Sequence, residues 1–568
     1  MVRAPLDAAL IEAWRARVER AGAQLKWMDQ RTTARPHAGG VLLAISAPQD
    51  QLLLATEINE WALCAALVER DPRRWAGLQA ALVAAANEGA EPGAIPAAPF
   101  GPVIEENAAL QRFAQLSRLE AAPKMRSLLK AAADRALPYF VDDSELTVGA
   151  GAGSRTFALS SLPNTDEVPW NDLSDIPTAI ITGSNGKTTT VRLLAACARA
   201  HGWRAGYNCT DGVFIGDERL AAGDYSGPAG TRLVMRDRRC QAAILEAARG
   251  GILRRGLAVA RADVAVVTNV SSDHFGEYGI DDLAGLADVK LSVASVTEGP
   301  LVLNADDALL RIKAQELAHR YGRAPKLAWF ALDADQPHLR EYRARGAATC
   351  GMRHGRLVWQ HAALENDLGP IDAMPLSIGG VAAYNVANLA AAALAAFALE
   401  ISADTIASVF KAFGATSADN PGRMMRFEFR GAQVLIDYAH NPDGLRGLLL
   451  VAQQLRGKGR LGLLLGHAGN RKDADIVDLA RVAAGFKPDL IVVKENEAQL
   501  RGRAPGEIPR IIRAELLRQG LPQSALPVRD TELDAARYAL DWARPGDVLA
   551  LPLHSLSARA AVVNLLQR

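Results

Sequence analysis

The sequence has 568 residues, which at about 150 residues per domain favours three to four domains and excludes a single one. Hydrophobic residues make up 49% and charged residues 22%, which is typical of globular proteins and excludes disorder over most of the chain. The 64 basic and 63 acidic side chains leave a formal charge of +1, so we expect no nucleic-acid partner. Five cysteines, none in a C-x-x-C pair, argue against a disulfide framework and a four-cysteine zinc site.

We expect a cytoplasmic protein with no membrane contact. Met1 to Trp14 carries acids as well as bases and no continuous apolar stretch, so no secretory signal is apparent. The longest apolar run, Leu389 to Leu399, has about eleven residues and is mostly alanine, whereas a membrane span needs about 18 to 20.

The first 135 residues read as a mixed region without recognisable chemistry. Helical spacing predicts helices over Leu6 to Ala21 and Gln51 to Glu69, and Gly40 to Ile45 reads as a strand. Gly89 to Pro102 is rich in Gly, Pro and Ala and predicts a linker or long loop, after which Leu110 to Ala136 returns to helical spacing. We predict an α+β N-terminal domain over residues 1–160, with a structural or docking role.

A phosphate-binding loop is the strongest signal in the chain. The apolar run Ala179-Ile180-Ile181 leads into Thr182-Gly-Ser-Asn-Gly-Lys-Thr-Thr-Thr190, and a helical pattern follows through Ala200. Strand, Gly-rich turn and helix is the layout in which backbone N–H groups and a helix N-terminus bind phosphate. The spacing departs from the general G-x-x-x-x-G-K-[ST] form, because position 181 is Ile. Lys187 would reach the β- and γ-phosphates and the Thr188 hydroxyl would bind Mg²⁺.

Strands alternate with helical stretches on both sides of residue 420, which favours α/β domains with mostly parallel sheets. The predicted strands are 242–245, 264–267, 301–303, 434–436, 461–465, 490–493 and 548–551. Asn420-Pro421-Gly422 is turn chemistry and marks a boundary. We therefore predict a P-loop central domain over 161–419 and a Rossmann-like C-terminal domain over 420–568.

Acidic and polar residues follow two of these strands. Glu246 ends one strand, where open α/β sheets bind ligands, and Asp273 and His274 follow another and could bind metal. On the residues alone, a glutamate such as Glu246 is more often a solvated loop acid than a ligand. An Asp-His pair after a strand, such as Asp273 and His274, is usually a capping pair.

Five sequence blocks together resemble the Mur ligase superfamily, whose members use ATP to join a carboxylate to the amine of an amino acid. They are Thr182 to Thr189, Thr268-Asn269 with Asp273-His274, Asn304 to Asp307, Asn385 to Asn388 and Asp437 to Pro442. Further residues resemble the Mur-like half of cyanophycin synthetases: Thr210 to Gly212, Gly223 to Pro228, Glu246 to Arg254, Asn420 to Met424, and Arg501 to Arg503 with Gly506-Glu507. Cyanophycin synthetases also carry an ATP-grasp module before that half. The Mur-like block begins here near residue 160, so we expect no such module and a single amide-forming step.

The resemblance implies an ATP- and Mg²⁺-dependent ligase with an acyl-phosphate intermediate. It assigns ATP binding to the loop residues Thr182, Gly183, Ser184, Asn185, Gly186, Lys187, Thr188 and Thr189. It places Asn304 and Asn385 near the adenine, and Arg423 and Asp437 near phosphate and ribose. Thr188 and Glu246 would hold one Mg²⁺, His274 would serve a second metal, and Lys290 matches a lysine that is carbamylated in many members. Lys187, Glu246, His274 and Lys290 are thus the candidate catalytic residues.

Substrate contacts are expected from both domains. Thr210, Asp211, Arg249 and Arg254 lie where the family binds its acceptor, and the arginines suit an acidic one. His440, Asn441, Lys494, Glu495 and Arg503 lie in the domain that binds the incoming amino acid, and Glu495 or Glu507 could pair with arginine. For each of these arginines and glutamates, a solvated surface charge is an equally good reading.

Three functions stay open at this point. The first is the addition of an amino acid such as arginine to an aspartate-type small molecule, peptide or polymer. The second is a Mur-type ligase with another peptide or a polyglutamyl substrate, and the third is a non-catalytic P-loop partner of a separate synthetase. The third is disfavoured because the candidate catalytic and metal-binding residues are intact: Lys187, Thr188, Glu246, His274 and Lys290. A homo-oligomer is compatible with any of them.

Overall fold

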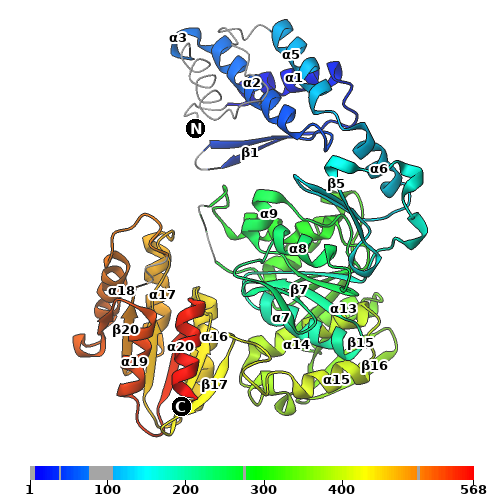
Figure 1. Ribbon diagram of the computed structural model, residues 1–568. Helices are drawn as coiled ribbons and strands as arrows, with labels where there is room; N and C mark the ends of the chain where they lie inside the picture. Colours follow the sequence, from blue (N-terminus) through cyan, green and yellow to red (C-terminus); the bar gives the residue numbers. More distant parts are fainter. Residues whose placement is uncertain are drawn as a thin grey trace.

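The computed structural model describes residues 7–37, 40–75, 106–272, 275, 277–495 and 499–567. Figure 1 shows an N-terminal helical part above a large central α/β domain, with a second α/β domain beside the latter. The chain is therefore a multidomain α/β protein, as the alternation of strands and helices predicts.

The N-terminal part is built from helices around a small core, with one hairpin. Its elements are α1 (Ala8–Gln24), β1 (Thr32–His37), β2 (Gly40–Ile45), α2 (Leu52–Arg70), α3 (Pro72–Trp75) and α5 (Glu106–Glu120). Trp14 and Val18 of α1 pack with Ile58 of α2 and Phe113 of α5. The two predicted helices and the predicted strand over Gly40 to Ile45 are confirmed, and the predicted linker 89–102 lies outside the described residues.

A second small unit follows, with α6 (Pro123–Ala133) and an antiparallel sheet of β3 (Tyr139–Val141), β4 (Glu145–Val148) and β5 (Arg155–Ala158). The single helical stretch expected over Leu110 to Ala136 is corrected to two helices, because Pro123 cannot continue α5 and instead occupies the first turn of α6. The core of this unit extends to Val168 and Leu173, a little past the predicted domain boundary.

The central domain holds an eleven-stranded sheet in the order β16-β15-β14-β13-β12-β11-β6-β10-β7-β8-β9. The strands from β14 to β7 in that order are parallel, and an antiparallel extension lies at each edge. Its strands are β6 (Thr178–Thr182), β7 (Ala205–Cys209), β8 (Gly212–Ile215), β9 (Glu218–Ala222), β10 (Ala242–Glu246), β11 (Val264–Val267), β12 (Pro300–Asn304), β13 (Lys326–Asp333), β14 (Thr349–Arg353), β15 (Arg356–His361) and β16 (Leu364–Pro370).

Helices cover both faces of this sheet because successive strand residues point to opposite sides. In β6, Ala179 and Ile181 join the core under α7, α14 and α15, while Ile180 joins the core on the other face. The helices are α7 (Lys187–Ala200), α8 (Pro228–Arg236), α9 (Arg249–Arg255), α10 (Leu283–Lys290), α11 (Ala308–Ala314), α12 (Leu317–Tyr321), α13 (Pro337–Ala344), α14 (Ala383–Ala398) and α15 (Ala403–Ala412).

The C-terminal domain is a second doubly covered sheet, in the order β17-β18-β22-β19-β20-β21, and β17 is its one antiparallel strand. The strands are β17 (Met425–Phe429), β18 (Ala432–Asp437), β19 (Leu461–Leu465), β20 (Leu490–Lys494), β21 (Val528–Arg529) and β22 (Val548–Pro552). The helices are α16 (Pro442–Arg456), α17 (Asp473–Gly485), α18 (Glu507–Arg518), α19 (Glu532–Trp542) and α20 (Leu556–Leu566). All seven strands predicted on either side of residue 420 are confirmed.

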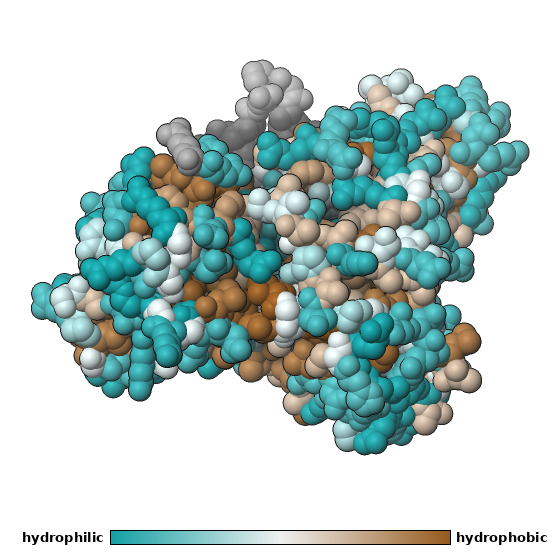
Figure 2. Space-filling model, turned by 90° about the horizontal axis from the view of Figure 1, so that it is seen from below, coloured by the Kyte–Doolittle hydropathy of each residue, from teal (hydrophilic) through white to brown (hydrophobic). Residues whose placement is uncertain are grey.

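The apolar run that we judged too short for a membrane lies in α14, buried against the central sheet. Over the described ranges, no helix is long and apolar enough to cross a membrane. Figure 2 shows a mostly hydrophilic surface on the face seen from below, with apolar residues gathered along the hollow between its two lobes.

Candidate active site

The predicted phosphate loop lies between β6 and α7 and requires glycine at two positions. Gly183 and Gly186 have φ values of +144° and +86°. A Cβ on Gly183 would stand 1.8 Å from Thr268 Oγ1, and one on Gly186 would stand 2.2 Å from Asn388 Oδ1. The side chains of Thr268 and Asn388 therefore lie so close to the loop backbone that a Cβ does not fit at either glycine.

The loop is held by the segment that follows β11. The Ser184 N–H donates to Asn269 O (2.9 Å) and the Asn185 N–H to Asn269 Oδ1 (2.9 Å). Thr268 Oγ1 donates to Asn185 O (2.6 Å). Lys187, the first residue of α7, curls back and donates from Nζ to Gly183 O and Ser184 O, both at 3.0 Å. The N–H groups of the loop and of the first helical turn are thus placed to bind an anion, next to the positive charge of the Lys187 ammonium group.

Glu246 stands beside this loop because β10 pairs with β6 in parallel register, with Glu246 opposite Ile181. Its side chain is buried, and Thr188 Oγ1 donates to Glu246 Oε2 at 2.8 Å while Thr210 Oγ1 donates to Oε1 at 3.4 Å. Burial raises the pKa of Glu246 above its ordinary value, while the Lys187 charge and the Thr188 hydroxyl favour its ionised form. A buried carboxylate beside two hydroxyls is an all-oxygen donor set, which suits a hard divalent cation.

Two cavities meet at this point. The first, of about 480 Å³, lies between the central and C-terminal domains and is lined by the loop. The second, of about 1090 Å³, lies on the other side of Lys187. Both are lined by Lys187, Thr210, Glu246, Tyr438 and His440. The buried carboxylate and the loop lysine therefore stand at the junction of two separate binding volumes.

The first cavity is lined by the loop residues from Ser184 to Thr189 and by Asn304, Asn385, Arg423 and Asp437, all predicted to surround the nucleotide. Of the other two predicted residues, Gly183 lines the second cavity and Thr182 lines neither. The Asn304 and Asn385 amides donate to the backbone carbonyls Thr268 O (3.0 Å) and Leu376 O (2.9 Å). Arg423 reaches over from the C-terminal domain, with Nη2 donating to Thr188 Oγ1 at 3.4 Å and its guanidinium 4.4 Å from the Tyr438 ring centroid. Asp437 accepts from the Met424 N–H (2.7 Å), and burial raises its pKa.

The other loop residues have fixed places. Thr182 is fully buried at the end of β6, and Ser184 Oγ donates to Ser271 O (3.0 Å). The Thr189 hydroxyl accepts from the Asn420 amide at 3.1 Å, which joins the loop helix to the link between the domains.

Five of the residues predicted on the substrate side line the second cavity, namely Thr210, Asp211, Arg249, Arg254 and His440, and the candidate catalytic residue Lys290 lines it as well. Arg249 is buried and forms an ion pair with Glu277. Lys290 is 3% exposed at the end of α10. Asp273 and His274 lie outside the described residues, so the predicted second metal ligand has no described position.

The other five residues named on the substrate side, Asn441, Lys494, Glu495, Arg503 and Glu507, lie outside the linings of both cavities. Asn441 caps α16 by accepting from the Gly444 N–H (2.8 Å), and its amide donates to Asn185 Oδ1 (3.0 Å). Arg503 pairs with Asp473 (2.7 Å) and Glu507 (2.6 Å). Glu495 Oε2 accepts from the Gly506 N–H (2.7 Å). Substrate roles for these residues stay predictions. Lys494 is fully buried in an ion pair with Glu532.

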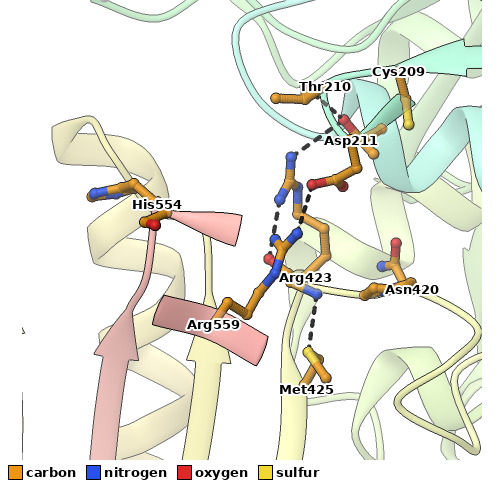
Figure 3. A network of polar contacts seen from close by, with 12 residues as sticks. Cys209, Thr210, Asp211, Asn420, Arg423, Met425, His554 and Arg559 are labelled. Atoms are coloured by element: carbon orange, nitrogen blue, oxygen red, sulfur yellow. Dashed lines mark hydrogen bonds and ion pairs between the residues drawn. The ribbon is translucent and has the colours of Figure 1, made fainter. Parts of the chain in front are cut away.

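Sequence reasoning missed the contacts that join the two domains. Arg192 of α7 and Arg559 of α20 both pair with Asp211, and Figure 3 shows Asp211 and Arg559 facing each other from ribbons of different domains. Arg192 lies five positions after Lys187 on the loop helix, but no motif singles it out. Among the described residues, no group of three His, Cys, Asp or Glu side chains is placed to hold a metal ion.

Comparison with known proteins matches the two domains separately. Residues 181–396 match the Mur ligase middle domain and residues 422–551 match the Mur ligase glutamate ligase domain. Cyanophycin synthetase of Crocosphaera subtropica is 34% identical over 398 residues, covering 70% of this chain and 44% of that protein. The Synechocystis cyanophycin synthetase is 35% identical, covering 69% and 45%. The chain thus spans about half the length of these curated relatives.

Two more distant proteins are similar over a comparable part of the chain. The UDP-N-acetylmuramoyl-L-alanyl-D-glutamate–2,6-diaminopimelate ligase of Listeria monocytogenes is 27% identical over 65% of this chain and 72% of that protein. The structure of E. coli FolC with DHPP and ADP has 20% identity, a TM-score of 0.51, and covers 69% of this chain and 88% of that one, a likeness of fold alone. The chain therefore belongs, through its middle and C-terminal domains, to the Mur ligase family.

Proposed function

We propose that the protein is an ATP-dependent ligase that joins a carboxylate to an amine through an acyl phosphate. The observation that carries this proposal is the junction of two cavities at Lys187, Thr210 and Glu246. A nucleotide in one cavity and a carboxylate in the other would meet at the groups that stabilise phosphoryl transfer. Similarity to ligases on both domains supports the same chemistry.

ATP is assigned to the first cavity. Its volume of about 480 Å³ falls in the range of about 300–1,000 Å³ typical of small-molecule sites. The loop N–H groups and the α7 N-terminus would bind the phosphates, with Lys187 as a fixed positive charge. Arg423 would add a second positive charge from the C-terminal domain, so ATP would contact both domains.

A divalent cation, Mg²⁺ in our proposal, fits the oxygen donors of Thr188 and Glu246. Bound there, it would neutralise phosphate charge as the γ-phosphoryl group is transferred. The predicted carbamate on Lys290 and the ligand role of His274 remain part of the proposal.

The chemistry balances in two steps. A carboxylate oxygen of the acceptor attacks the γ-phosphorus of ATP, the bond to the β-phosphate oxygen breaks, and ADP leaves. The donor amine then attacks the acyl carbon, loses a proton, and expels phosphate that carries the former carboxylate oxygen. Lys187 and Arg423 would counter the growing negative charge. Burial of the junction between the domains would keep water from the acyl phosphate.

The second cavity favours an acidic acceptor. Besides Lys187, the basic side chains that line it are Arg249, Arg254, Arg255, Lys290, Arg471 and Arg501. Arginine side chains hold carboxylates in a bidentate, charge-assisted geometry. We therefore propose an aspartate-type acceptor. Arginine is the first donor to test, because the relatives with 34–35% identity are cyanophycin synthetases.

An ATP-dependent phosphate-release screen tests the proposal. The acceptors are aspartyl peptides, poly-aspartate, polyglutamate and muramyl peptides, each paired with single amino acids. Lys187→Ala should abolish release, whereas Lys411→Ala, an exposed lysine of α15, should leave it unchanged. No turnover with any pair, together with no ATP binding, would refute the proposal. Turnover with muramyl or polyglutamyl acceptors alone would keep the ligase proposal but replace its aspartate-type acceptor by one of these substrates.

A further inference from the structure

A buried charge network joins the phosphate loop to the last helix of the chain. Asp211, in the turn after β7, accepts at Oδ2 from Arg192 Nη2 (2.6 Å) and at Oδ1 from Arg559 Nη2 (2.7 Å). Arg192 belongs to α7 and Arg559 to α20, so one carboxylate ties the loop helix to the C-terminal domain (Figure 3).

All three side chains are removed from water: Arg192 is 5% exposed, and Asp211 and Arg559 are each 7% exposed. Burial alone raises the pKa of Asp211, but the charges of Arg423, Arg192 and Arg559 outweigh it, so that pKa lies below its ordinary value. Asp211 is thus held as an anion between cations. Ion pairs in such surroundings are sensitive to the loss of one partner, which leaves a buried charge without compensation.

The same network fixes the link between the domains. Arg192 Nη1 also donates to Asn420 Oδ1 (3.2 Å) and Pro421 O (2.9 Å). Gly422 follows with φ +73°, and a Cβ placed on it would stand 1.7 Å from Arg559 Nη1. The next residue is Arg423, whose guanidinium faces the Thr188 hydroxyl. The arginines around Asp211 therefore hold the turn that carries Arg423 toward the phosphate loop.

We propose that Arg192, Asp211 and Arg559 form an interdomain latch that holds the C-terminal domain closed and positions Arg423 at the nucleotide site. These three are positioning residues. For Asp211, this role replaces the substrate contact that we expected from the sequence. The kinetic part of this inference rests on the proposed ligase function, whereas the closed arrangement of the domains does not.

Two variants open the latch by independent means. Arg559→Met removes one cation while Asp211 keeps its pair with Arg192, and Gly422→Ala displaces the Arg559 guanidinium without removing a charge. Arg481→Met is the matched control, because it removes an arginine that pairs with Glu515 and Asp478 within the C-terminal domain. Arg559→Lys keeps the charge without the planar fork and should give an intermediate effect.

The readouts are the radius of gyration from solution X-ray scattering, with and without a non-hydrolysable ATP analogue, and the separate values of kcat and KM for ATP. We expect both latch variants to have a larger radius of gyration than the wild type. Their kcat should fall about ten- to a hundredfold, since misplacing a positioned group costs up to about a hundredfold. KM for ATP should rise less than kcat falls, because the phosphate loop lies wholly in the central domain and opening the latch removes only the Arg423 contact to the nucleotide. Arg481→Met should change neither quantity.

A radius of gyration and a kcat equal to those of Arg481→Met in both latch variants would overturn the inference. A parallel loss of ATP affinity and thermal stability would also overturn it, since that pattern marks general structural damage. If Arg559→Met does not fold, Gly422→Ala and Arg559→Lys carry the test. If the wild type turns over no substrate pair, the ligase proposal fails while scattering still decides the latch.

Discussion

Substitution of Gly183 by alanine tests whether the shape of the loop is what binds ATP. The positive φ of +144° disfavours any side chain, at a cost of about 1–2 kcal/mol. The new Cβ would also strike Thr268 Oγ1, which donates to Asn185 O and Thr182 O. The hydroxyl carries one proton, which the two carbonyl groups share, so displacing it loses one hydrogen bond, contributing about 0.5–1.5 kcal/mol. The total of about 1.5–3.5 kcal/mol would appear largely as weaker ATP binding, because the free loop relaxes and the ligand must restore it.

At 1.4 kcal/mol per factor of ten, this predicts that the ATP dissociation constant rises roughly 10- to 300-fold. Calorimetric titration of ATP measures it, and Gly202→Ala is the matched control. Gly202 has a comparable φ of +106°, but a Cβ there would meet no atom within 4 Å. If Gly183→Ala bound ATP within twofold of Gly202→Ala, the loop would not be the nucleotide site. Adding Thr268→Ala, which removes the clashing hydroxyl, should recover part of the lost affinity.

Two further changes probe the metal site and the C-terminal core. Glu246→Gln keeps the shape of the side chain but removes its charge, so the Mg²⁺ concentration for half-maximal phosphate release should rise at least about tenfold; an unchanged requirement would contradict the assignment. Glu532→Gln leaves fully buried Lys494 without its carboxylate and should lower the unfolding free energy at pH 7 by about 3–5 kcal/mol. Burial raises the pKa of Glu532, but the Lys494 charge and His554 outweigh burial and hold that pKa well below its ordinary 4.5. The stabilisation from the ionised Glu532 is therefore complete above pH 4.5 and is lost as the pH falls below that value. Denaturant unfolding should therefore find a smaller difference from wild type at pH 3 than at pH 7, and an equal difference would contradict the ion-pair account.

The loop and the strands were predictable because their signals are local. A buried strand, two glycines and the start of a helix fall within residues 178–200, and parallel strands bring their carboxyl ends to one edge. Strand order alone left Glu246 at the ligand-binding edge of the sheet, and only the resemblance to Mur ligases placed it beside Thr188. The break at Pro123 was also readable, since proline favours the first turn of a new helix.

Contacts between the domains were not predictable in the same way. Asp211 and Arg559 are 348 positions apart, and no periodicity or motif links an acidic turn residue to an arginine in the last helix. Similarly, no sequence pattern indicates the ion pairs of Arg503 with Asp473 and Glu507, and the substrate role of Arg503 stays a prediction. Side-chain pairing depends on how whole domains pack, which single-sequence patterns do not record.

The most direct test of the ligase account follows an oxygen atom. The acceptor that supports turnover is labelled with ¹⁸O in its carboxylate, ATP is left unlabelled, and the released phosphate is analysed by mass spectrometry. Transfer through an acyl phosphate predicts one ¹⁸O in each phosphate, because the amine expels the former carboxylate oxygen with it. Unlabelled phosphate accompanying the amide product would contradict the account.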